Sequence, residues 1–126
     1  MKEFRLSLPH RPSELANVAE ALARKGVNLK SVAGLSEGNK ATIALVGHDV
    51  NALRQALQEA RIRFEEVELL TVEMEDQPGQ LADLAAKLSN AGVNLTSLYV
   101  LGKEGGKVQL GLTTDQVPKA KKALGQ

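Results

Sequence analysis

The sequence lacks the residues on which several classes of site depend. It contains no cysteine, so disulfides, thiolate metal sites and a cysteine nucleophile are excluded. Its two histidines, His10 and His48, have no metal-binding spacing, so we expect no metal and no cofactor. Aromatic residues make up only 2% of the chain, which is too few for a sheet that stacks nucleic acid bases.

Charge of one sign and long apolar runs are also missing. The chain has sixteen basic and fifteen acidic residues, and its net charge of +1 is too small to attract nucleic acid or anionic lipid. No apolar run approaches the roughly 18 residues that span a bilayer, and the polar N-terminus does not resemble a signal peptide. We therefore expect a cytoplasmic protein with no membrane and no nucleic acid partner.

The chain of 126 residues is a repeat. Shifted by 66, the segment 12–31 aligns without a gap on 78–97, and half of the positions are identical. The identical pairs are Pro12/Pro78, Leu15/Leu81, Ala16/Ala82, Ala19/Ala85, Leu22/Leu88, Gly26/Gly92, Val27/Val93, Asn28/Asn94, Leu29/Leu95 and Ser31/Ser97. Two similar units, 1–69 and 70–126, are predicted.

Each unit has the same order of apolar patterns. A strand pattern of period two at Phe4, Leu6 and Leu8 recurs at Leu70, Val72 and Met74. A helical stripe follows in both units, then a hairpin and a second helix. The stripes consist of Leu15, Val18, Ala19 and Leu22, and of Leu81, Leu84, Ala85 and Leu88. This order predicts an α+β fold of two ferredoxin-like βαββαβ units in tandem, each an antiparallel sheet with two helices on one face.

Single residues set the expected ends of these elements. Pro12 and Pro78 suit the first turn of a helix, and Gly26 and Gly92 suit a left-handed residue after its last turn. Asp49 and Asp115 are the expected N-caps of the second helices.

The junction of the units has its own pattern. Val67 and Leu69 are expected to face inward in the fourth strand of unit 1. The apolar phase then shifts by one residue at Leu70, which predicts either a hand-over to the next sheet or a simple bulge. Because the sequence stops after the second helix of unit 2, we expect that unit to lack its own final strand and to leave an open edge beside Leu70–Met74.

A candidate ligand site lies where the first strand of unit 2 meets its helix. Gly79 leaves room for a ligand carboxylate at the helix N-terminus, Asp76 is an acceptor for an ammonium group, and the amide of Asn94 both donates and accepts. Together these groups could hold a free amino acid. Ordinary helix capping with a packing glycine is the alternative interpretation.

The stretch DQPGQLADLAAKLSNAGVNL resembles the signature of the ACT domain, a ferredoxin-like module that senses amino acids. The resemblance covers nearly the whole chain and implies a stand-alone tandem ACT protein with no catalytic domain. It further implies an effector bound at an interface between ACT units, a homodimer, and a regulated enzyme or regulator as partner. The ligand-binding residues that it implies in unit 2 are Asp76, Gln77, Pro78, Gly79, Gln80, Asn94, Leu95 and Thr96.

Unit 1 departs from this signature. His10, Arg11 and Ser13 replace Asp76, Gln77 and Gly79, whereas Asn28 is retained. Either unit 1 is structural, or it is a second, weaker site in which His10 and Arg11 hold a more anionic group.

Three functions remain open from the sequence. The first is allosteric sensing of an amino acid or related metabolite. The second is a ligand-free assembly module built on paired sheets. An enzyme is the third, but the chain has no recognisable nucleophile–base or metal constellation, so no catalytic activity is expected.

Overall fold

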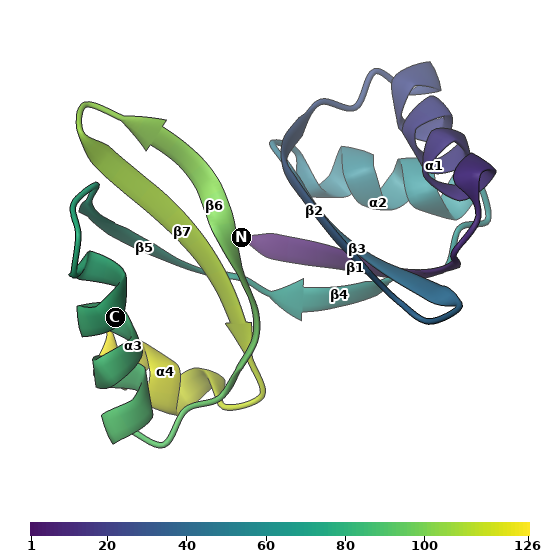
Figure 1. The fold of residues 1–126 in the computed structure, drawn as a ribbon. Coiled ribbons are helices and arrows are strands. Elements are labelled where there is room, and N and C mark those ends of the chain that lie inside the picture. Colours follow the sequence, from purple (N-terminus) through teal and green to yellow (C-terminus); the bar gives the residue numbers. More distant parts are fainter. The chain divides into compact units, whose positions relative to one another are not determined.

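The computed structural model describes all residues, 1–126, and divides them into two compact units, residues 1–67 and 68–126 (Figure 1). The sequence placed this division two residues later, after residue 69. None of the four helices is both long and apolar enough to cross a membrane.

Unit 1 has a four-stranded antiparallel sheet with strand order β2-β3-β1-β4. Its elements are β1 (Lys2–Pro9), α1 (Pro12–Arg24), β2 (Leu29–Glu37), β3 (Lys40–Gly47), α2 (Val50–Glu59) and β4 (Glu65–Glu68). Phe4 and Leu6 of β1 are fully buried in its core with residues of both helices, and the ring of Phe64 lies 5.4 Å from that of Phe4.

Unit 2 repeats this order up to its second helix. Its elements are β5 (Leu70–Glu75), α3 (Gln80–Asn90), β6 (Leu95–Glu104), β7 (Lys107–Thr114) and α4 (Val117–Ala123). The sheet has three strands in the order β5-β7-β6, so β5 is an outer strand. Its core centres on Leu112, which is fully buried. The predicted α+β fold of two ferredoxin-like units, the second without a fourth strand, is confirmed.

The shift in the apolar phase between the units marks the point where the chain passes from the first sheet to the second. Only Leu69 separates β4, in the four-stranded sheet, from β5, in the three-stranded sheet. Leu69 was expected to face inward in unit 1, and this was wrong. Its buried side chain lies in unit 2, where a Cβ added at Gly111 would be 3.1 Å from Leu69 Cδ1.

The helical stripes are only partly buried. Val18 and Leu22 of α1, and Leu84 and Leu88 of α3, pack into the cores. The first leucines of the stripes, Leu15 and Leu81, are 51% and 54% exposed, and the alanines of both stripes are exposed. The period of the apolar residues determines the angle of a side chain about the helix axis but not how far along the helix the sheet extends. In both helices the first turn extends past the part that packs on the core, so its leucine is exposed.

The expected helix ends are confirmed at some positions and wrong at others. Gly26 and Gly92 have φ values of +65° and +71°, and Asp49 caps α2 by accepting a hydrogen bond from the amide of Ala52 at 3.1 Å. Asp115 does not cap α4: the N-cap is Gln116, whose amide donates to Thr114 Oγ1 at 3.1 Å. No side chain caps α4.

Candidate functional site

The loop between β5 and α3 extends the sheet by one residue before it turns. The amide of Asp76 donates to the carbonyl of Gly106 at 2.9 Å, in line with the β5–β7 register. The amide of Gln77 then donates back to Glu75 at 2.9 Å, which closes a tight turn. This turn fixes the backbone of Asp76 at the end of the strand and leaves its side chain exposed.

Gly79 is required by its backbone conformation. Its φ is +90°, which side-chain-bearing residues rarely adopt, whereas a Cβ at this position would meet no atom within 4 Å. Gly79 is therefore the N-cap, and α3 begins at Gln80. The expectation that Pro78 lies in the first helical turn is wrong, because a residue of positive φ separates it from the helix.

The N-terminus of α3 carries amide groups without an acceptor. The amide of Gln80 donates to the carbonyl of Gln77 at 3.3 Å, and that of Asp83 to Gly79 at 3.0 Å. No side chain caps the helix, and the N–H groups of Leu81 and Ala82 donate to no other backbone group. Unpaired amides and the helix dipole give this end a partial positive charge that favours a carboxylate.

Asp76 lies in the loop that leads to these amides, and its side chain has one cationic neighbour. Its Oδ2 atom is 3.4 Å from the ammonium Nζ of Lys103, near the end of β6, and both side chains are more than half exposed. A long, exposed contact of this kind is weak, so the carboxylate remains accessible to another ammonium group. Lys103 was not among the predicted site residues, because only the β6–β7 hairpin brings it next to Asp76.

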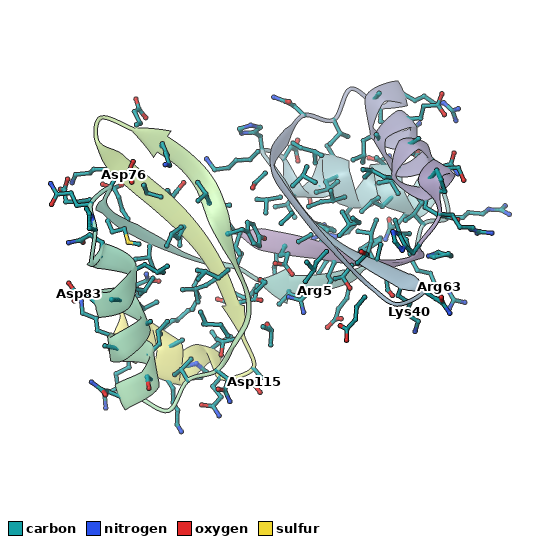
Figure 2. The ribbon with its side chains drawn as sticks, in the orientation of Figure 1. Arg5, Lys40, Arg63, Asp76, Asp83 and Asp115 are labelled. Carbon is teal, nitrogen blue, oxygen red and sulfur yellow. The ribbon has the colours of Figure 1, made fainter.

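Asn94, Leu95 and Thr96 lie at the other end of the sheet. The register pairs Glu75 with Lys107 and Leu95 with Thr114. Seven residues of β7 therefore separate the two ends, which is about 23 Å at 3.3 Å per residue. Figure 2 shows Asp76 at one end of unit 2 and Asp115, which follows β7, at the other.

The start of β6 is held by hydroxyl groups. Thr114 Oγ1 donates to the carbonyl of Asn94 at 2.7 Å, and the hydroxyls of Thr96 and Ser97 lie 2.7 and 2.6 Å from that of Thr113. The side chain of Asn94 is exposed, and Leu95 packs at the margin of the core. Within one copy of unit 2, Asn94 and Thr96 therefore do not lie near the Asp76 loop, because α3 carries the chain along the full length of the sheet.

The corresponding loop of unit 1 has a different shape. α1 begins at Pro12, with Arg11 as an extended N-cap, so Ser13 lies within the helix and no residue of this loop has positive φ. The guanidinium of Arg11 forms an ion pair with Glu14 at 2.5 Å, and the amide of His10 donates to Asn39 at 2.8 Å.

A pocket of about 230 Å³ lies beside this loop, between the start of α1 and the β2–β3 hairpin. Leu8, Arg11, Leu15 and Leu35 contribute to its lining. Asn28, which precedes β2, lies at the far end of the unit, where its carbonyl accepts from the amide of His48.

A larger groove of about 680 Å³ runs between β5 and α3. Gln80 is the one predicted site residue that lines it; the others in this groove, such as Met74, Leu84 and Lys87, were not selected from the sequence. The repeat holds a usable signal for them, because most have a counterpart 66 residues earlier in an equivalent groove of unit 1. No group of three or more His, Cys, Asp or Glu residues is placed to hold a metal ion.

Comparison with known proteins finds one family model that matches unit 2 and several solved structures of similar fold. The model of the ACT domain matches residues 69–124. No curated protein matches the chain.

Solved structures resemble the whole chain. A protein from Bacteroides thetaiotaomicron is similar with a TM-score of 0.87 and 18% identity, over 98% of this chain and 85% of that one. The regulatory subunit of aspartate kinase from Thermus thermophilus is similar with a TM-score of 0.66 and 19% identity, over 99% and 90% of the two chains. The same subunit from Thermus flavus gives 0.63 and 18%, over 99% and 90%. At these sequence identities, the similarity shows that the chain shares the fold of these proteins.

Proposed function

We propose that this protein, whose residues 69–124 match the model of the ACT domain, is an allosteric module that binds a free amino acid or a related metabolite. The observation that carries the proposal is the N-terminus of α3, where the amides after Gly79 are unpaired and the preceding loop carries the exposed carboxylate of Asp76.

This loop has a binding group for both the carboxylate and the ammonium group of a zwitterionic amino acid. The α-carboxylate would accept hydrogen bonds from the amides at the start of α3, and the α-ammonium would bind Asp76 in competition with Lys103. Gln77, Pro78 and Gln80 shape the loop around these groups. Because Gly79 carries no side chain, a ligand can approach the backbone closely.

We further propose that Asn94, Leu95 and Thr96 serve a ligand held by the loop of another ACT unit. Within their own unit they are about 23 Å from that loop, by the strand spacing, and the exposed amide of Asn94 is available to such a ligand. A site made from two units would couple ligand binding to association, which is how an effector shifts a population of states. A homodimer that acts on an enzyme or regulator is the assembly that this arrangement favours, in keeping with the aspartate kinase regulatory subunits of similar fold.

Unit 1 has a structural role in this proposal. Arg11 is neutralised by Glu14, and Ser13 replaces the glycine whose positive φ opens the loop in unit 2. No catalytic step is assigned to either unit.

The test is thermal denaturation of the purified protein with each amino acid in turn. A ligand present at about 100 times its Kd adds about 2.7 kcal/mol to the free energy of unfolding, which raises the melting temperature. Asp76→Asn should weaken the response, and Asp83→Asn, an exposed carboxylate in the first turn of the same helix, is the matched control. A response that both variants retain would refute the role of Asp76.

A ligand-free assembly module is the second candidate, and the outer strand β5 favours it. It predicts an oligomer whose dissociation constant no amino acid alters. Sedimentation equilibrium with and without the panel distinguishes the two functions.

A further inference from the structure

The outer edge of β5 has the geometry of a strand acceptor. The amide of Asp76 bonds to β7, so in an antiparallel pair the alternate residues Thr71, Glu73 and Glu75 direct their N–H and C=O groups away from β7. The side-chain amide of Gln126 donates to the carbonyl of Thr71 at 2.7 Å, and the carbonyl of Glu75 accepts from Gln77. Glu73, at the centre of the strand, therefore presents a free donor and a free acceptor at the edge of the sheet.

The groove between β5 and α3 lies on the helix side of this edge. It has apolar walls at Val72, Met74, Leu84 and Leu124. Side chains of an added strand alternate between the two faces of the sheet, so every second one would enter this groove.

Unit 1 contains an equivalent groove, and there a segment of the chain itself covers the outer side. Its lining includes Leu8 and Val18, which stand 66 residues before Met74 and Leu84, and its volume is about 630 Å³. The segment Ala60–Arg63, which leads into β4, closes its outer side. From this segment and its continuation, Ile62 and Phe64 pack against the core of unit 1.

Charge indicates what kind of strand fits unit 2. In unit 1 the arriving segment brings Arg61 and Arg63 into a groove that also contains Glu14 and Glu20. In unit 2 three carboxylates lie at this edge: Asp83 belongs to α3, and Glu73 and Glu75 of β5 direct their side chains to the face of the sheet opposite Val72 and Met74. Lys107 is 3.4 Å from Glu73 and 3.9 Å from Glu75 and offsets part of this charge, and Lys87 also lines the groove. The net excess of carboxylates favours a cationic segment.

We propose that the edge of β5 binds an extended segment of a partner protein in which apolar residues alternate with lysine or arginine. The segment adds to the sheet as a fourth strand through the backbone of Glu73, and its apolar side chains enter the groove beside Met74 and Leu84. This inference does not depend on amino-acid binding at the Asp76 loop.

The probe is a fluorescein-labelled octapeptide, RIRFKKVK, which is the segment 61–68 with its three glutamates replaced by lysine. Its binding is followed by anisotropy on the full chain. Glu73→Pro removes the outward N–H and no bond to β7, and prolines are tolerated on edge strands. Glu73→Thr is the matched control, because it removes the same carboxylate and keeps the N–H.

We expect the peptide to bind the wild-type chain and Glu73→Thr. Glu73→Pro should bind about three- to tenfold more weakly than Glu73→Thr, which corresponds to the loss of one backbone hydrogen bond. Replacing the isoleucine and phenylalanine of the peptide by serine should abolish binding. Unchanged far-ultraviolet circular dichroism and melting temperature of both variants confirm that the fold is intact.

Three results would overturn the proposal. The first is no binding of the peptide to the wild-type chain, and the second is equal affinity of the peptide for Glu73→Pro and Glu73→Thr. The third is a wild-type dimer in sedimentation that Glu73→Pro alone converts to a monomer, because the edge would then be occupied by a second copy of this chain and not by a different partner.

Discussion

The conformation of Gly79 leads to a prediction about stability in unit 2. Gly79→Ala forces an alanine to a φ of +90°, whereas the added methyl group meets no atom within 4 Å. The left-handed region costs a side-chain-bearing residue about 1–2 kcal/mol. Replacing glycine also lowers the entropy of the unfolded chain, which returns about 0.4–1 kcal/mol. We expect a net loss of about 1 kcal/mol.

Gly102→Ala is a matched control in the same unit. Gly102 has ordinary φ, and a Cβ there would also meet nothing within 4 Å. The entropic gain is common to both variants, so the difference between them isolates the cost of positive φ at about 1–2 kcal/mol. Gly102→Ala should be as stable as the wild type or slightly more stable.

The measurement is urea denaturation followed by the fluorescence of Tyr99. It is the only tyrosine in a chain without tryptophan, and it lies in β6, so the signal reports unit 2 alone. In a unit of this size, 1 kcal/mol also shifts the melting temperature by about 4–8 °C. Equal stability of the two variants would refute the argument that backbone conformation, and not crowding, selects glycine before α3.

Three further predictions concern the cores, the caps and pH. Leu112→Ala removes a fully buried side chain from the core of unit 2 and should cost about 2–5 kcal/mol in the same urea assay. Asp49→Ala removes a capping hydrogen bond and should cost about 0.5–2 kcal/mol by thermal denaturation, whereas Asp115→Ala, at a position that caps nothing, should change the melting temperature little. Hydrogen bonds from Arg54 at 2.7 and 2.6 Å lower the pKa of Glu66, so their stabilisation is present above the unfolded pKa of about 4.3 and is lost as pH falls through the lower folded pKa. Acid titration of stability should therefore show the wild type approaching Glu66→Gln below that range, and a constant difference at all pH values would contradict it.

Local patterns in the sequence predicted the elements well. The strand at Leu70–Met74 and the left-handed glycine at Gly92 depend on interactions within a few residues, and both are present in the structure. The hand-over at Leu69 was also readable, because a one-residue change of phase reverses the face of a strand.

Predictions that depended on distant residues were less successful. Asp115 was expected to cap α4, but the helix begins one residue later, after Gln116, and no side chain caps it. Leu81 shares the apolar stripe of α3 and is half exposed, because its burial depends on how far the sheet extends along the helix. The candidate ligand residues could be named from the sequence, but their separation could not.

The sequence by itself determined that one βαββα pattern is written twice, because identities at a constant offset and short apolar periods require no knowledge of long-range contacts. Only the tertiary structure decided that Asp76 and Asn94 lie at opposite ends of a sheet, and that Glu73 faces outward on its edge. The physical reason is that antiparallel register and strand order arise from pairing between residues far apart in the chain, which no local pattern specifies.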